Sequence, residues 1–426
     1  MTILFLAHLL VLIALGFILR KNASASLRVF FWPAYMVKLS AGVGIGLLYS
    51  LYYSTGDTYN YFQDGLTLAD LAQQDIAAYL RFIACTDTEA PVWQQLVFQD
   101  PRALFLSKVV SVFALFTGRN YWIIGGYFSL CSFSAAWYLV EVVCRHTTRH
   151  TLAALLAFLF FPSVMFWSAG IVKESLAMAA LYVLCAAFLQ YWRRMPIPWG
   201  VWFAVPLCMW FLWMLKYYYF AAFFPVVFTA VAVRFLWSWF RWRSRLIMPL
   251  VWLAVFVLPL SLAASIHPNF YPERFLEVVV SNYEVYTALS DPQDRIDYPG
   301  FNATVGSVVG HMPKALLSAL FRPLPWEAHR LFQYVISVEN CILLVLCGLC
   351  LWHFRKGAGM TNDDLILVVS ILVYVVVLAV FLALSTPNFG TLSRYRVGFV
   401  PFLVFLLTCG NNHLERLQLR FLNRSA

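Results

Sequence analysis

Residues 363–385 read DDLILVVSILVYVVVLAVFLALS, an apolar run that opens with two aspartates and then carries no further charge. A helix needs about 20 apolar residues to cross the hydrocarbon core of a bilayer, which is about 30 Å thick. The strands of a membrane barrel would instead alternate between apolar and polar residues. This run therefore predicts a membrane-spanning helix.

Similar apolar runs recur along the whole chain. Of its 426 residues, 62% are hydrophobic and 12% are charged, against about 45–50% and 25% in ordinary soluble domains. We expect an all-α polytopic membrane protein with about eleven transmembrane helices, forming a single transmembrane domain over residues 1–426. The predicted spans are residues 2–20, 30–53, 120–143, 151–170, 175–192, 197–215, 219–236, 246–265, 328–353, 363–385 and 396–411.

The basic residues are unevenly divided between the two ends of these spans. Most lie on one side, where only Asp363, Asp364 and Glu415 oppose them. They are Arg20, Lys21, Arg28, Arg145, Arg149, Arg193, Arg194, Arg234, Arg241, Arg243, Arg245, Arg355, Lys356, Arg416, Arg420 and Arg424. Cytoplasmic loops carry an excess of Lys and Arg, so we expect the N-terminus outside and the C-terminus in the cytoplasm. The net charge of +10 then reflects topology, and no nucleic-acid partner is expected.

Two long segments, residues 54–119 and 266–327, lie on the side predicted to be outside. Long connections in an otherwise compact bundle are usually functional, so we interpret both as functional insertions. In the first segment, apolar residues recur at helical spacing between residues 68 and 83, with polar residues between them. This pattern predicts an amphipathic helix on the membrane surface, and a second helix follows near Arg102–Phe116.

Asp57 directly follows the second predicted span, at the boundary between membrane and water. If the chain is helical there, Asp57, Tyr61 and Asp64 share a face, because they are four and then three residues apart. A carboxylate in that position can accept the proton of a hydroxyl nucleophile. The alternative is that Asp57 caps a helix after Gly56. We take Asp57 as the candidate catalytic residue, with Tyr61 and Asp64 as candidate substrate contacts.

Lys173 and Glu174 lie in a tight connection between two spans. Charges near a membrane are costly unless they are paired or exposed. The pair either caps a helix, or Lys173 meets an anionic substrate and Glu174 orients it. Glu339 lies inside a predicted span, where an ionisable group is a functional candidate by default. Glu141 is close enough to a cytoplasmic end to pair with Arg145, so we do not count it as a candidate.

Two arginines, Arg394 and Arg396, lie just before the last predicted span, although the charge rule disfavours them on the outer side. An extended backbone would place both on the same side, where guanidinium forks suit a phosphate or diphosphate. Arg322 could join the same cationic rim. Pairing with acidic residues of the long outer segments is the alternative.

The order of these features resembles the GT-C superfamily of polyprenyl-phosphate-sugar-dependent membrane glycosyltransferases. The resemblance is closest over about residues 50–190 and looser toward the C-terminus. The motifs are Asp57-x-x-x-Tyr61 after an early span, Gly118-Arg119-Asn120-Tyr121-Trp122 entering the next one, Phe161-Pro162…Trp167-Ser168…Lys173-Glu174, and Arg394-Tyr395-Arg396 before a span with Pro401. In that family the acidic residue commonly follows the first span, so its place here implies an extra N-terminal helix.

The resemblance implies inverting transfer of a sugar from a polyprenyl-phosphate donor to a surface glycan or lipid acceptor, in the plasma (inner) membrane of a bacterium. It assigns Asp57 as the base or acceptor-orienting group, and Lys173, Arg394 and Arg396 as contacts of the donor phosphate. No cofactor is expected, since no His/Asp cluster indicates a metal, although a divalent cation stays open. The alternatives are a polysaccharide polymerase or ligase that uses lipid-diphosphate-linked glycans, and a transporter or flippase of lipid-linked sugars.

Overall fold

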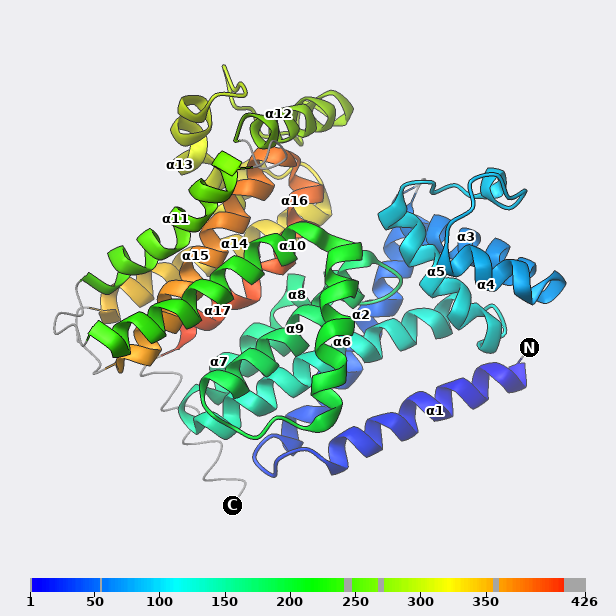
Figure 1. Ribbon diagram of the computed structural model, residues 1–426. Helices are drawn as coiled ribbons and strands as arrows, with labels where there is room; N and C mark the ends of the chain where they lie inside the picture. The colour runs from blue at the N-terminus through cyan, green and yellow to red at the C-terminus, as the bar shows by residue number, and fades with distance from the viewer. Residues whose placement is uncertain (1, 54–55, 241–246, 267–271, 355–359, 410–426) are drawn as a thin grey trace. The chain divides into compact units, whose positions relative to one another are not determined.

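A computed structural model describes residues 2–53, 56–240, 247–266, 272–354 and 360–409 of the chain (Figure 1). These residues form helices joined by turns, and no β-strand is found among them. They divide into two compact units, one ending at Tyr217 and the other beginning at Tyr218, and each unit is described by itself below. The single transmembrane domain inferred from the sequence stays a prediction.

Among the described residues, seven helices are long and apolar enough to cross a membrane, or up to eight if one bent pair counts as a span. This confirms a helical, polytopic membrane protein but not the predicted count of eleven spans. The seven are α1 (Thr2–Lys21), α2 (Arg28–Leu51), α6 (Tyr121–His146), α9 (Lys173–Trp192), α10 (Trp199–Phe240), α14 (Leu331–Phe354) and α15 (Asn362–Ser385). The basic residues within 241–246, 355–359 and 410–426, which we expect on the cytoplasmic side, lie outside the described residues.

The helix α10 covers two predicted spans, residues 197–215 and 219–236. It has 42 residues, and only Lys216 inside it has non-helical dihedral angles, with φ −145° and ψ 68°. A straight helix of that length would be about 63 Å long, about twice the thickness of the hydrocarbon core. The break at Lys216 therefore falls where the sequence predicts the end of one span and the start of another.

The predicted span at residues 151–170 is not one continuous helix. It consists of α7 (Thr151–Leu155), a π-helical turn (Leu156–Phe160) and α8 (Pro162–Trp167). The break has a local cause: Pro162 lacks an N–H, and its ring keeps Phe161 in an extended conformation, with φ −69° and ψ 123°. After α8, the chain turns at Gly170, whose φ is +67°. A Cβ on Gly170 would lie 3.2 Å from the carbonyl oxygen of Gly42, so the turn packs directly on α2.

The first unit is centred on α6, which packs against α2 and α9 and is buried along most of its length. At one end of α6, the Glu141 carboxylate accepts a 2.8 Å hydrogen bond from the Ser24 N–H, and its Oε2 lies 3.8 Å from Arg145 Nε. The pairing of Glu141 with Arg145 expected from the sequence is therefore confirmed.

Residues 57–116 of this unit form a small helical body, which we call the α3–α5 module. Its elements are α3 (Asp57–Gln74), α4 (Ile76–Ala84), a 3-10 turn (Trp93–Gln95) and α5 (Pro101–Phe116). The predicted amphipathic helix is thus two helices. They separate at Asp75, whose carboxylate caps α4 by accepting 2.9 Å hydrogen bonds from the N–H groups of Ala77 and Ala78.

The α3–α5 module has an apolar core of its own. The core side chains come from both helices, the turn and α5: Leu68, Tyr79, Phe82, Val92, Leu96 and Leu104. On the other face of α4, Ile76 and Leu80 remain 57% and 58% exposed. An apolar strip therefore faces away from the core, as an interfacial helix requires. Its location on a membrane surface stays a prediction.

The second unit contains the remaining part of α10 and the helices after it. Its further elements are α11 (Met248–Ile266), α12 (Pro272–Leu289), α13 (Val305–Phe321), a 3-10 turn (Pro325–Glu327), α14, α15, α16 (Phe389–Tyr395), a 3-10 turn (Arg396–Gly398) and α17 (Val400–Thr408). The last predicted span, 396–411, falls across two short helical segments, Phe389–Gly398 and Val400–Thr408, which are bent by 64° relative to each other. Its residues 410 and 411 lie outside the described part.

At each end of this unit, contacts join segments that the sequence predicts to lie on the same side of the membrane. Arg234 of α10 lies 2.6 Å from Asp363 at the start of α15. Toward the other end, the N–H of Ile296 donates to the carbonyl oxygen of Pro387, and that of Phe389 donates to the carbonyl oxygen of Asp294. The second long segment is thereby attached to the turn before α16.

Candidate functional site

The N-terminal turn of α3 is fixed against α6. The Thr58 hydroxyl is 2.7 Å from the Tyr121 hydroxyl, and the Tyr59 ring stacks on the Tyr121 ring with centroids 4.5 Å apart. Gly56, not Asp57, is the N-cap of α3, so the interpretation of Asp57 as the cap itself is wrong. Asp57 is the first helical residue and is exposed, and the positive end of the helix dipole stabilises its carboxylate.

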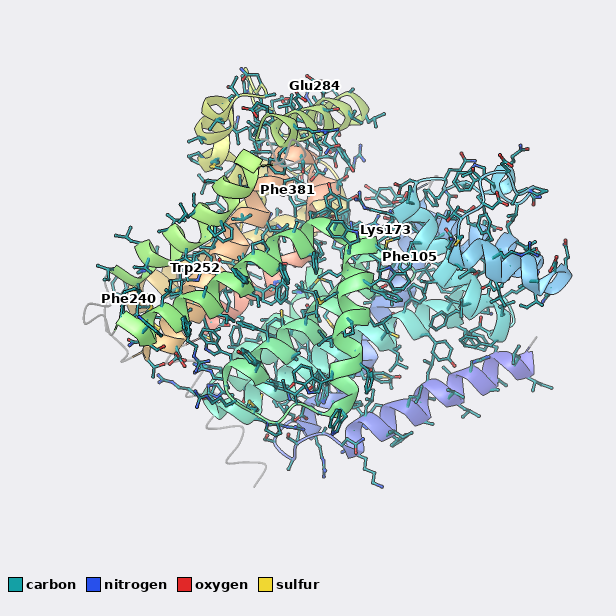
Figure 2. All side chains as sticks on the ribbon, in the orientation of Figure 1. Phe105, Lys173, Phe240, Trp252, Glu284 and Phe381 are labelled. Atoms are coloured by element: carbon teal, nitrogen blue, oxygen red, sulfur yellow. The ribbon has the colours of Figure 1, made fainter. Side chains whose placement is uncertain are left out.

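Tyr61 lies one turn after Asp57 and is buried under two side chains. Its ring stacks on that of Phe98 with centroids 4.5 Å apart, and the Lys173 Nζ lies 5.7 Å from its centroid. The same Nζ is 3.9 Å from Oδ2 of Asp100, the N-cap of α5. Lys173 is labelled in Figure 2. The fold therefore brings Lys173, from the start of α9, to the α3 turn that carries Asp57 and Tyr61.

Asp64 is only 1% exposed, although it lies on the same helix. Its carboxylate accepts hydrogen bonds from the N–H groups of Val97 and Phe98, at 2.8 and 3.0 Å, and from the Ser107 hydroxyl at 3.3 Å. Burial raises the pKa of this carboxyl, and the three hydrogen bonds oppose that shift. These contacts favour a structural role: Asp64 holds the stretch that places Phe98 against Tyr61.

Glu174 is fully buried in the first turn of α9, and its partner is a lysine from a distant part of the sequence. The Nζ of Lys216, itself 4% exposed, lies 2.7 Å from Glu174 Oε1. Lys216 is therefore a buried partner of Glu174 and not an anchor at the membrane surface. The signal that could have found the pair is a lysine inside a long apolar and aromatic run. Because Glu174 neighbours Lys173, the ion pair fixes the helix end that presents the Lys173 cation.

In the second unit, Arg396 is buried and paired. Its Nη2 donates to Glu339 Oε1 at 2.9 Å, and its Nη1 donates to Asn340 Oδ1 at 2.5 Å. The extended backbone considered for residues 394–396 is wrong, because Arg394 lies in the last turn of α16 and Arg396 begins the 3-10 turn. Residues two apart in a helix do not face the same way, so the two arginines do not form one cationic face. The structure joins two predicted residues, Glu339 and Arg396, in an ion pair.

Arg322 is also paired within the second unit. Its Nε donates to Glu327 Oε1 at 2.7 Å, and its guanidinium lies 5.2 Å from the centre of the Phe389 ring. Pairing with an acidic residue of the long outer segments, the alternative considered for this region, therefore holds for Arg322. Arg396 pairs instead with Glu339, which lies inside a predicted span. Arg394 is 8% exposed and lies in the same short helix as Phe389.

No family model, curated protein or solved structure matches this chain. The resemblance to the GT-C superfamily thus stays an expectation that depends on the residues themselves. Among the described residues, no group of three or more His, Cys, Asp or Glu side chains is placed to hold a metal ion.

Lys38 is a buried cation that the sequence analysis did not single out. It lies near the middle of α2 and is 3% exposed. Its Nζ donates to the Ser168 hydroxyl at 2.6 Å and to the Met165 carbonyl oxygen at 3.3 Å. Both partners lie at the C-terminal end of α8, where helix carbonyl groups favour a cation. An ionisable residue inside a predicted span was the available signal.

The contacts of Arg396 lead to a testable prediction about stability. Lys cannot reproduce two hydrogen bonds from one planar fork, so Arg396→Lys is expected to lower the free energy of unfolding by about 1–3 kcal/mol. Donor affinity per folded molecule should be unchanged. Thermal unfolding in detergent and a donor-binding titration measure the two quantities. Arg295→Lys is the matched control, because the ion pair of Arg295 with Asp297 is partly exposed. Weaker donor binding at unchanged stability would restore the phosphate-binding role of Arg396.

Proposed function

We propose that this protein is a membrane glycosyltransferase that moves a sugar from a polyprenyl-phosphate donor to a surface glycan or lipid acceptor on the non-cytoplasmic side. The observation that supports it best is the exposed Asp57 carboxylate, one helical turn from Tyr61, over whose ring Lys173 lies. Glycosyl transfer from a phosphate requires a base for the acceptor hydroxyl and a cation for the phosphate.

In this mechanism the acceptor hydroxyl gives its proton to Asp57 as its oxygen attacks the anomeric carbon. The bond from that carbon to the phosphate oxygen breaks on the opposite face, so the configuration inverts. Polyprenyl phosphate leaves with the electron pair, and the Lys173 cation stabilises its negative charge. Glu174 and Lys216 act as positioning residues, since they fix the start of α9.

A transporter is the alternative that one observation favours, because transport sites use polar groups near the middle of the membrane. Lys38 is such a group. Its hydrogen bonds to Ser168 and Met165, however, place the ammonium group at the C-terminal end of α8, where the helix dipole stabilises a cation. A structural role explains Lys38 without a transported substrate, so we favour the transferase.

Lipid and glycan profiling of cells that lack the protein tests the proposal. Without the transferase, a polyprenyl-linked monosaccharide donor should accumulate and one sugar should be missing from the surface glycan. Restoring the wild-type chain should reverse both changes. Accumulation of a lipid-linked oligosaccharide repeat would favour a polymerase or ligase, and an unchanged glycan with unchanged lipid carriers would contradict the proposal.

A further inference from the structure

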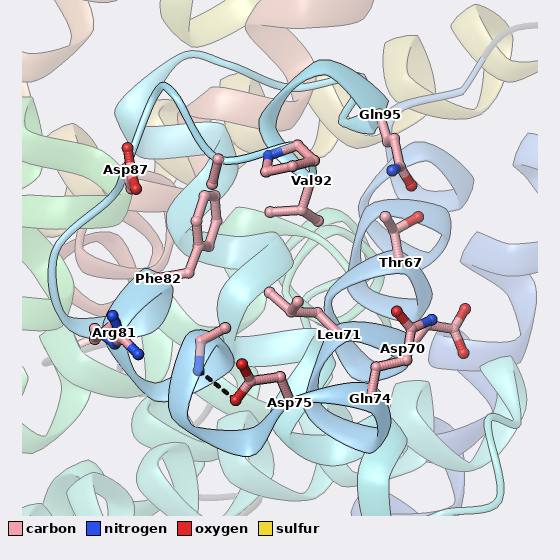
Figure 3. Close-up of a pocket in the computed structure, with 13 residues that line it drawn as sticks. Thr67, Asp70, Leu71, Gln74, Asp75, Arg81, Phe82, Asp87, Val92 and Gln95 are labelled. Atoms are coloured by element: carbon pink, nitrogen blue, oxygen red, sulfur yellow. Dashed lines mark hydrogen bonds between the residues drawn. The ribbon is translucent and has the colours of Figure 1, made fainter.

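The α3–α5 module contains a cleft of about 610 Å³ between α3, α4 and residues 87–95 (Figure 3). Sites for small molecules commonly have volumes of about 300–1,000 Å³. Neither Asp57 nor Lys173 lines this cleft. It is therefore a second site within the first unit, distinct from the candidate site at the start of α3.

The cleft has an apolar floor and a polar rim. Leu71, Phe82 and Val92 form the floor, and Phe82 and Val92 belong to the core of the module, which makes the floor rigid. Figure 3 shows Arg81 and Asp87 on one side of the cleft and Gln95 on the other. The rim residues are exposed, so their planar polar groups are accessible to a ligand.

The charges of the lining select against an anion. The lining contains three carboxylates, those of Asp70, Asp75 and Asp87, and one cation, Arg81. Asp70 forms an ion pair with Arg119 from outside the lining, and Asp75 accepts hydrogen bonds from the N–H groups of Ala77 and Ala78. The remaining negative charge opposes a lipid phosphate or an acidic sugar.

Neutral sugars match this combination of groups. Their hydroxyl groups can donate to the carboxylates and accept from Arg81 and the side-chain amides of the rim. Their C–H faces can lie against an apolar floor. We infer that the cleft binds a neutral oligosaccharide, as the acceptor glycan of the transfer reaction. The acceptor role rests on the proposed function, whereas the binding of a neutral saccharide does not.

The experiment uses the full chain in nanodiscs of neutral lipid, applied to an array of neutral, amino-sugar and uronic-acid oligosaccharides. Wild type should bind neutral glycans and should not prefer acidic ones. Gln95→Ala removes one hydrogen-bonding group and should weaken binding about two- to tenfold. Gln94→Ala is the matched control: Gln94 is exposed on the same turn but does not line the cleft, so binding should be unchanged.

Asp87→Asn tests the electrostatic part of the inference. Asn can keep the 2.9 Å hydrogen bond that Asp87 Oδ1 accepts from the Glu89 N–H, while one negative charge is lost. Binding of uronic-acid glycans should rise several-fold relative to neutral glycans. A purely structural role of Asp87 would leave this ratio unchanged and would contradict the inference.

Three outcomes would overturn the inference: no glycan binding by wild type, a preference for acidic glycans, or equal losses in Gln95→Ala and Gln94→Ala. Binding of phosphatidylglycerol vesicles that Gln95→Ala abolishes would also overturn it, in favour of a lipid headgroup. Asp57→Asn separates this inference from the proposed function. That variant should still bind glycans, so a failure of either proposal is recognised by its own measurement.

Discussion

Asp57→Asn is expected to reduce sugar transfer by at least about a hundredfold, because a general base contributes about 10²–10⁴-fold to the rate of proton transfer. Asn keeps the size of the side chain and one hydrogen-bonding oxygen but cannot take up the proton. Since Gly56 provides the N-cap of α3, the helix does not depend on Asp57 as its cap. The variant should therefore fold and reach the membrane normally. Turnover with a defined polyprenyl-phosphate sugar measures the effect.

Glu89→Gln is the matched control for this prediction. Glu89 is an exposed carboxylate in the same module and does not line the cleft, so its neutralisation should leave turnover unchanged. Near-normal turnover of Asp57→Asn would remove Asp57 from the mechanism.

Labelling of an Asp57→Cys protein from the outside of intact cells tests on which side of the membrane residue 57 lies. Labelling only after lysis would be incompatible with transfer on the non-cytoplasmic side.

Removing one member of the buried Glu174–Lys216 pair should be strongly destabilising. Lys216→Met leaves the Glu174 carboxylate buried without the ammonium group that lies 2.7 Å from it. Loss of one partner of a buried ion pair costs about 3–5 kcal/mol of folding free energy. Replacing both residues, with Glu174→Leu and Lys216→Met together, should recover most of that loss, because an apolar pair of similar volume is often as stable.

Thermal unfolding in detergent, followed by tryptophan fluorescence, provides the measurement for both variants. Arg295→Gln supplies the comparison, because the Arg295–Asp297 pair is partly exposed and is worth at most about 1 kcal/mol. The prediction that an apolar pair can replace the ion pair is contradicted if the double variant unfolds at the same temperature as Lys216→Met alone. If the double variant is stable yet transfers sugar slowly, the pair positions Lys173 in addition to stabilising the fold.

The helical membrane fold could be predicted because long apolar runs identify spans directly. The predicted bounds of α2, α6, α9 and α15 agree with the structure to within a few residues. The break before Pro162 was missed because the apolar composition continues through it. A hydropathy pattern records which residues avoid water, and it does not record whether the backbone remains helical.

The candidate site was predictable only in part. Asp57 and Tyr61 are one helical turn apart, so their proximity follows from local sequence. Four charged residues form two ion pairs that the sequence did not predict: Glu174 with Lys216, and Arg396 with Glu339. These contacts join residues that are far apart in the chain, and local spacing carries no information about them. Burial then decides the role of each charge, since a cation enclosed by protein cannot at the same time form an accessible rim.

The α3–α5 module has an apolar core of its own, and this has an evolutionary consequence. Leu68 and Leu104 stabilise the module from within, while Gln94 and Gln95 are exposed outside that core. If the cleft binds the glycan that we propose, a substitution at Gln95 changes ligand preference without disturbing the core of the module. Among descendants of this chain, Gln95 should then diversify rapidly and Leu68 slowly, because only Leu68 belongs to the core.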